Sequence, residues 1–268
     1  MRKKLSIILF ILIISIFAVA CSNKKEKDNS NVLVTLVLDK GGVNDESFNQ
    51  LAWEGAKKAS IEYGIKIKYL ESNTDADYKS NLEQAVDLDS NLIIAVGFNL
   101  SEALKEAAIY YPKSSFAIID GSFDKIPENV TNINFDEGEA GYLAGLASAK
   151  TLDSNKFGFI GGISVPAVEN YKEGFEKGLL EVNPNIELSV QYANSFSDAA
   201  KGKAIATQMY NNDINCIMSA GGGVNNGVYE VAREKGKYAV GVDMAQNYIS
   251  PKVILTSAIK KVDVGVEN

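Results

Sequence analysis

The chain has 268 residues, a formal net charge of −7 at pH 7 and no histidine. The absence of histidine removes His-based catalytic triads, most zinc sites and the commonest general base, so an enzymatic function is disfavoured. The net charge is negative and no stretch combines basic with aromatic residues, which argues against nucleic-acid binding. We find no dinucleotide-binding or phosphate-binding glycine motif and expect no cofactor and no metal.

The N-terminus has the pattern of a lipoprotein signal peptide over residues 1–20. Three cationic residues precede an apolar run that is too short to span a bilayer comfortably, and this run stops at Cys21. Cleavage would leave Cys21 as the first mature residue, acylated and followed by a polar tether over residues 21–31. We therefore expect a protein that is lipid-anchored to the cell membrane and faces the periplasm or the cell exterior. An ordinary secretory signal or an uncleaved anchor is the alternative.

The remaining chain alternates short β-branched segments with longer amphipathic ones, which predicts βαβ units and parallel sheets. In the first half the expected strands are 32–38, 65–70, 92–96, 116–119 and 130–134, with helices at 47–63, 77–87, 101–110 and 137–150. The second half has strands at 156–160, 187–191, 216–220, 238–242 and 253–257, with helices at 165–180, 199–210 and 225–235. Cys216 lies in an apolar strand and is expected in the core.

Two similar halves predict an α/β fold with two lobes across a cleft, as in type I periplasmic binding proteins. Each lobe would be a mostly parallel sheet flanked by helices. We assign residues 32–150 and 257–268 to the first lobe and 151–256 to the second. The chain stops within a helix that begins near Lys260, so we expect the C-terminal part of the first lobe to be missing from this sequence.

Glycine and polar residues follow most of the expected strands. They are Asp39, residues 41–45, 97–99, 120–121, 161–162, 194–196, 221–225 and 241–243. In open α/β sheets the ligand lies beyond the carboxyl ends of the strands, so these residues should line the cleft. Glycine and aspartate are also the usual turn residues after any strand, so each one alone is weak evidence.

The segment DKGGVNDESFNQ, residues 39–50, is the most specific feature. It resembles the opening motif of the basic membrane protein and purine nucleoside receptor lipoproteins, which are substrate-binding components of ABC importers. The resemblance continues through residues 120–121, 135–145, 220–225, 241–243 and 256–260, and thus covers the mature chain. It implies a monomer that captures adenosine, guanosine or inosine by lobe closure and delivers it to a membrane permease driven by a separate ATPase.

The same resemblance implies which residues touch the ligand. In that family a purine base is sandwiched between two aromatic rings, which here would be Phe48 and Phe196. It places Asn44, Asp45 and Asp120 as polar contacts in the first lobe, Gly222 among the ligand-binding residues, and Asp243 with Lys260 at the ribose. Each base–ring stack contributes about 1–3 kcal/mol.

Several of these assignments have alternatives. Phe48 could be a hydrophobic staple and Ser47 a helix N-cap. Lys261 follows Lys260 directly and leaves the register open by one residue. The small-residue helix at 137–150 is expected to pack against its own lobe's sheet rather than touch ligand.

Two other functions compete with nucleoside capture. The first is a surface-exposed lipoprotein that binds host or matrix macromolecules without transport. The second is an enzyme on the same fold, such as a nucleoside hydrolase, for which clustered carboxylates like Asp39 and Asp45 would be needed. The preferred nucleoside is not determined by the sequence.

Overall fold

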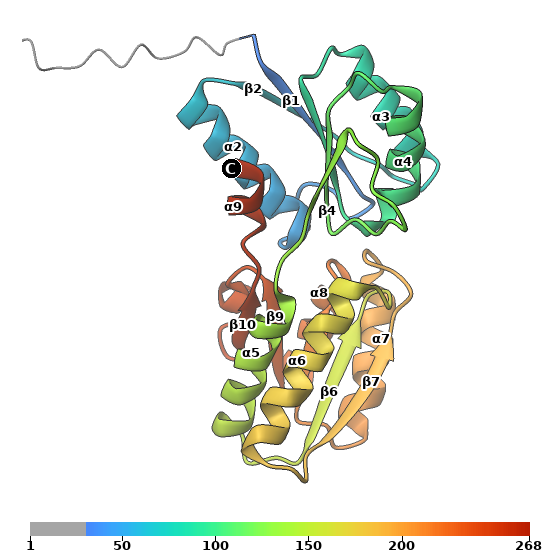
Figure 1. Cartoon of the computed structure of the whole chain (residues 1–268). Coiled ribbons are helices and arrows are strands. Elements are labelled where there is room, and N and C mark those ends of the chain that lie inside the picture. Colours follow the sequence, from blue (N-terminus) through green and yellow to red (C-terminus); the bar gives the residue numbers. More distant parts are fainter. Residues whose placement is uncertain (1–30) are drawn as a thin grey trace, which may run out of the picture.

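The computed structural model describes residues 31–268, and the expected signal peptide, Cys21 and most of the tether lie outside this range. Two α/β lobes lie end to end and are joined at a narrow waist (Figure 1). No helix in the described part of the chain has both the length and the apolar character needed to cross a membrane.

The first lobe has a five-stranded, all-parallel sheet with the order β2-β1-β3-β4-β5. Its strands are β1 (Leu33–Leu38), β2 (Lys66–Leu70), β3 (Leu92–Val96), β4 (Phe116–Ile119) and β5 (Val130–Ile133). Its helices are α2 (Phe48–Tyr63), α3 (Asp77–Asp87), the 3-10 turn η1 (Phe98–Leu100), α4 (Ser101–Tyr110) and α9 (Val262–Glu267).

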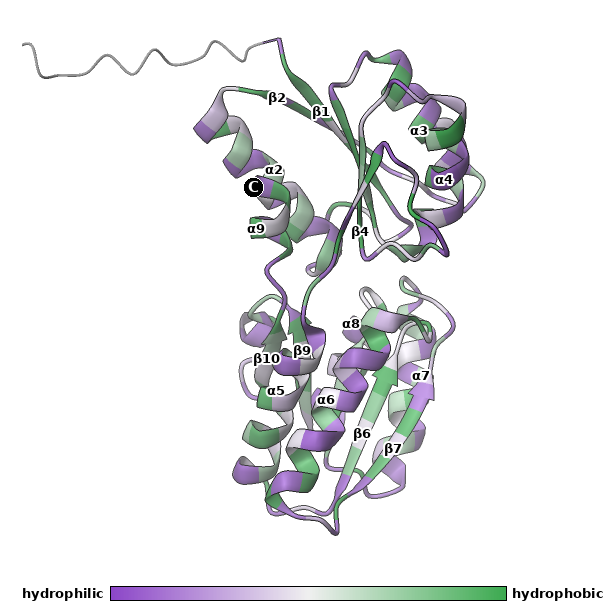
Figure 2. Ribbon diagram, viewed as in Figure 1, coloured by the Kyte–Doolittle hydropathy of each residue, from purple (hydrophilic) through white to green (hydrophobic). Residues whose placement is uncertain are grey.

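Both faces of this sheet are covered, which is why its central strand β3 is apolar throughout and β1 is apolar except for Thr35. Alternate residues point to opposite faces: Leu36 and Leu38 pack toward α2 and α9, whereas Val37 packs toward α3 and α4. Figure 2 shows this pattern, with apolar residues gathered on the strands and hydrophilic residues spread over the helices.

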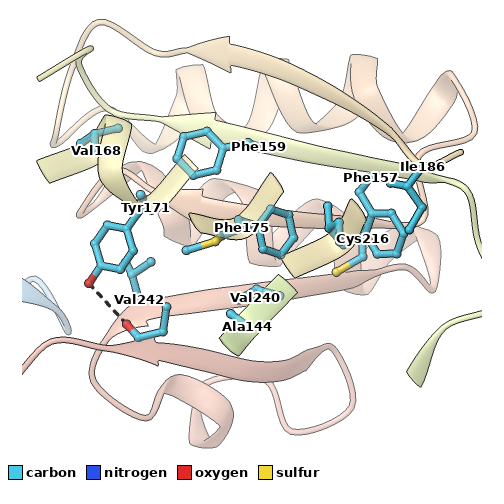
Figure 3. Packing of buried hydrophobic residues seen from close by; sticks show 14 of the residues in the cluster. Ala144, Phe157, Phe159, Val168, Tyr171, Phe175, Ile186, Cys216, Val240 and Val242 are labelled. Carbon is cyan, nitrogen blue, oxygen red and sulfur yellow. Dashed lines mark hydrogen bonds between the residues drawn. The ribbon is translucent and has the colours of Figure 1, made fainter. Parts of the chain in front are cut away.

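The second lobe repeats the architecture with the parallel order β10-β9-β8-β6-β7. Its strands are β6 (Lys156–Gly161), β7 (Glu187–Tyr192), β8 (Cys216–Ala220), β9 (Tyr238–Asp243) and β10 (Ile254–Ile259). Its helices are α5 (Glu137–Thr151), α6 (Pro166–Val182), α7 (Ala199–Asn211), α8 (Val224–Lys235) and the 3-10 turn η2 (Gln246–Tyr248). Buried aromatic rings and Cys216 fill the layer between the sheet and α6 (Figure 3).

The lobe boundary differs from the sequence-based assignment in two places. Helix α5, expected in the first lobe, packs against α6 and β10 of the second. Its glycines make this packing close, because a Cβ on Gly141 would lie 2.4 Å from the main-chain oxygen of Tyr171, and one on Gly174 would lie 2.1 Å from that of Gly138. The small residues of α5 therefore face a helix and not the first sheet.

Residues 257–259, also expected in the first lobe, are the end of β10 and pair with β9 in the second sheet. The chain thus crosses between lobes at residues 134–136 and again at 260–261. The second crossing carries Lys260, which lines the site described next, so this connection between the lobes also forms part of the cleft.

Candidate functional site

A cavity lies between the lobes at the carboxyl ends of both sheets. It is partly open to solvent, and its lining comes from both lobes. The first lobe contributes Asp39, Asp45, Phe48, Asn49, Gly97, Phe98 and Asp120. The second contributes Val165, Ala167, Val168, Tyr171, Phe196, Ala220, Gly221, Gly222, Val242 and Asp243, and Lys260 lies at a crossing. A ligand held here would touch both lobes.

Two phenylalanine rings line the cavity from opposite lobes. Phe48 is the first residue of α2, and Phe196 lies in the loop between β7 and α7. The Phe196 ring packs on Gly162, where a Cβ would be 2.3 Å from its Cδ1 atom. Only a glycine at position 162 leaves room for this ring. A third ring, Phe98 on η1, reaches from the first lobe to the hydrophobic core of the second.

Asp45 caps helix α2. Its carboxylate accepts hydrogen bonds from the main-chain N–H groups of Ser47, Asn49 and Gln50, at 2.9, 2.9 and 3.1 Å. These bonds satisfy amides that the first turn of a helix leaves without partners. Asp45 lines the cavity while its oxygens accept these helix hydrogen bonds, so it has a structural role, and its contact with a ligand stays a prediction.

Asn44 does not line the cavity. It is exposed and lies in the turn before α2. The amide that faces the cavity is that of Asn49, directly after Phe48. Sequence reasoning passed over Asn49 although it belongs to the same motif, because the turn before α2 determines which amide points inward.

Asp39 and Asn49 form a buried polar pair that lines the cavity. Asn49 Nδ2 donates to Asp39 Oδ1 at 2.8 Å and to Asp45 Oδ2 at 3.1 Å. Its Oδ1 atom has no hydrogen-bond partner, although the residue is only 2% exposed. An unpaired buried acceptor is costly and indicates that a donor from a ligand or a water is expected there. Burial raises the pKa of Asp39, while hydrogen bonds from Asn49 and Gly41 oppose this rise.

Lys260 is buried against Asp120 and Glu137. Its Nζ contacts Asp120 and lies 2.7 Å from Glu137 Oε1, and Lys260 and Glu137 are each less than 5% exposed. Burial disfavours the charged amine, but the carboxylates of Asp120, Glu137 and Asp243 outweigh it and raise the pKa of Lys260. Its neighbour Lys261 is exposed. The lysine of the site is therefore Lys260.

Asp243 ends β9 on the second-lobe side and is buried. It accepts a hydrogen bond from the hydroxyl of Ser47 in the first lobe. Burial raises the pKa of Asp243 to about 6, against the opposing influence of Lys260 and Ser47. Asp120 and Asp243 both adopt left-handed conformations, with φ of 57° and 66°, which is uncommon outside glycine. Such strain concentrates at functional sites.

Tyr171 of α6 is a lining residue that the sequence analysis did not identify. Its hydroxyl donates to the main-chain oxygen of Ala258 at 3.4 Å (Figure 3), and burial raises its pKa well above the usual value. A tyrosine in the middle of a predicted helix carries no local sign of lining a cleft. Its role depends on how α6 lies on the second sheet.

The arrangement is suited to binding and not to covalent chemistry. Four carboxylates and one ammonium group line a cavity with apolar walls. Within residues 31–268 no cluster of three or more His, Cys, Asp or Glu side chains is arranged to hold a metal ion. Carboxylates and the free amide oxygen are acceptors, so the chemistry favours a ligand with flat faces and several hydrogen-bond donors.

The model of the PnrA-like ABC transporter substrate-binding proteins matches residues 32–268. The chain belongs to this family. Its members are binding proteins and not enzymes, so the hydrolase alternative is not supported.

Two relatives and one solved structure extend the comparison. The chain is 37% identical to "ABC transporter nucleoside-binding protein BmpA" of Lactococcus lactis, over 92% of this chain and 76% of that protein. It is 37% identical to "Basic membrane protein A" of Borreliella burgdorferi, over 96% and 76%. An ABC transporter solute-binding protein from Aeropyrum pernix has the same fold, with a TM-score of 0.78 and 29% identity over 88% of this chain and 69% of that one.

Proposed function

We propose that this protein captures purine nucleosides for an ABC importer. The observation that carries the proposal is the pair of rings, Phe48 and Phe196, which line one cavity from opposite lobes. A purine between them would stack on both faces, each stack being worth about 1–3 kcal/mol. Because the rings belong to different lobes, such a ligand would link its own binding to lobe closure. The nucleoside-binding name of the Lactococcus lactis relative agrees with this function.

The base edge would meet Asp39 and Asn49. The free Oδ1 of Asn49 is an acceptor, and Asp39 offers carboxylate oxygens beside it. Purines present N–H donors along their edges, and a buried acceptor that lacks a partner discriminates strongly against ligands without a donor. The amide and carboxylate therefore supply specificity, whereas the rings supply affinity.

The ribose would meet Asp243, Gly222 and Lys260. An ionised carboxylate accepts hydrogen bonds only and suits a sugar diol, whereas an ammonium group donates to hydroxyl oxygens. Asp120 stays with Lys260 and holds it in place. The net negative lining disfavours an added phosphate, so nucleosides and not nucleotides fit this cavity.

The other parts of the proposal concern the surroundings of the protein. Its partners are the permease and ATPase of an importer, as the family description implies. The pattern at residues 1–21 supports lipid attachment at Cys21 and a location outside the cytoplasm, at the membrane. We propose that it acts as a monomer, since one chain supplies both walls of the cavity.

Isothermal titration of the chain from Ser22 onward tests the proposal, after unfolding and refolding to remove any copurified ligand. Adenosine, guanosine and inosine should bind, with cytidine much weaker and guanosine monophosphate weaker than guanosine. A folded chain that binds no purine nucleoside, or that binds cytidine equally well, would contradict the function proposed.

A further inference from the structure

Gln246 connects the two lobes outside the ligand cavity. It begins the turn η2 after β9, is 2% exposed and is not among the lining residues. Its Nε2 donates to the main-chain oxygen of Glu46 in the first lobe at 2.9 Å, across 200 positions in sequence. Glu46 lies in the turn that leads into α2 and has a left-handed φ of 54°.

The second lobe holds the Gln246 side chain in place before any contact with the first lobe is made. Its Oε1 accepts from the hydroxyl of Tyr229 at 2.6 Å and from the main-chain N–H of Val242 at 3.1 Å. Its main-chain N–H donates to Ser257 Oγ at 3.1 Å. Gly241 leaves the space for this arrangement, because a Cβ there would lie 2.6 Å from Gln246 Oε1.

We infer that Gln246 is a closure latch for nucleoside capture, a positioning residue that stabilises the closed lobes without touching the ligand. Because two hydrogen bonds within the second lobe fix the side-chain amide and a third holds the main chain of Gln246, the amide N–H group can be satisfied by the first lobe only when the cleft is closed. Separation of the lobes breaks that bond. A contact present only in the closed state shifts the opening equilibrium and so slows ligand release.

The bond from Gln246 reaches the turn before α2, which carries residues of the ligand cavity. Glu46 lies between Asp45, which caps α2, and Ser47, which bonds Asp243. Fixing the main chain of Glu46 therefore orients the start of α2, where Phe48 presents its ring. This inference rests on the proposed nucleoside function for its ligand, but the lobe contact itself does not depend on that ligand.

Gln246→Glu tests the latch, with Tyr210→Phe as the matched control. The glutamate keeps an acceptor for Tyr229 and Val242 but places a carboxylate oxygen where the amide N–H donated to Glu46. Tyr210 is buried in the second lobe and its hydroxyl donates to the main-chain oxygen of Tyr238 at 2.7 Å, so Tyr210→Phe removes a bond within that lobe that does not involve Gln246. Stopped-flow fluorescence of Trp53 with inosine should show dissociation at least about fivefold faster in Gln246→Glu, with the association rate unchanged and Tyr210→Phe close to wild type.

An unchanged dissociation rate in Gln246→Glu overturns the inference, and so does an equal acceleration in Tyr210→Phe, which would indicate general loosening of the second lobe. If the wild-type chain binds no purine nucleoside, the proposed function fails, and the latch is then tested on the ligand-free protein. Small-angle scattering should then show a larger radius of gyration for Gln246→Glu than for Tyr210→Phe, and equal radii overturn the inference.

Discussion

Ser47 donates a hydrogen bond to Asp243 across the cleft, although the two residues are 196 positions apart. The sequence offered Ser47 as an N-cap of the helix that follows, but its side chain makes no capping bond. Asp45 accepts the first amides of α2 instead. Within one short turn, Asp45 thus caps the helix and Ser47 connects the two lobes.

This division of roles predicts that substitution of Ser47 affects ligand affinity, whereas substitution of Asp45 affects the stability of the fold. Ser47→Ala should weaken nucleoside binding about fivefold, by the loss of one closed-state hydrogen bond, and leave the unfolding temperature nearly unchanged. Asp45→Ala should lower the free energy of unfolding by about 1 kcal/mol or more through the lost cap. Titration and thermal unfolding of both variants measure this. Equal destabilisation by the two substitutions would contradict the assignment.

The pH dependence of binding should follow Asp243. Burial raises its pKa to about 6, so the ligand-free protein holds a proton on this carboxyl below that pH. A sugar diol donates to the ionised form, so binding expels the proton, and affinity should fall about tenfold for each pH unit below that pKa. Titration one unit below and one unit above, in buffers of different ionisation enthalpy, measures the proton release. Asp243→Asn should bind weakly at both pH values without this step, and a flat wild-type profile would refute the role.

Removing the buried lysine should destabilise the fold. Lys260→Met leaves Asp120 and Glu137 buried without their cation, which costs about 3–5 kcal/mol of unfolding free energy for a broken buried pair. Lys261→Met is the matched control, because that neighbour is exposed. Urea unfolding should separate the two variants clearly. Adding Asp120→Asn to Lys260→Met should restore part of the loss, and equal stability of the two single variants would show that the buried charges matter little.

The aromatic walls predict a binding series. Phe48→Ala and Phe196→Ala should each weaken purine nucleoside binding by about 1–3 kcal/mol. Gly162→Ala should weaken it as well, although Gly162 is not a lining residue, because its new Cβ displaces the Phe196 ring. Tyr110→Ala, at an exposed position on α4, is the control and should bind as wild type. Wild-type affinity in Phe48→Ala and Phe196→Ala together would exclude stacking between these rings.

Close contact between α5 and α6 predicts a contrast between two glycines. Gly174→Ala places a Cβ 2.1 Å from the main-chain oxygen of Gly138 and must separate the helices, which should cost about 1–3 kcal/mol. Gly138→Ala places its Cβ 3.3 Å from the Asp136 side chain and 3.8 Å from the main-chain oxygen of Asn170, and should be neutral or slightly stabilising because alanine favours a helix. Thermal unfolding compares the two, and similar melting temperatures would mean that the helices can separate freely.

The sequence was sufficient to predict the architecture, because βαβ alternation is a local pattern that repeats along the chain. It also located the cleft, since residues after parallel strands meet at one edge: Asp120, Phe196, Gly222 and Asp243 all line the cavity. The sequence could not show which residues of the 39–50 motif face the cavity. Whether Asn44 or Asn49 faces inward depends on the turn that Asp45 forms with the start of α2.

Alternating hydrophobicity and strand-end residues thus determined from the sequence that two parallel-sheet lobes meet across a cleft. Only the tertiary structure assigned α5 to the second lobe, because complementary glycine faces on α5 and α6 become neighbours only when both helices lie on one sheet. Only the tertiary structure paired Ser47 with Asp243 and Gln246 with Glu46. Such contacts join residues about two hundred positions apart and depend on the relative position of the lobes, which no local pattern in the chain encodes.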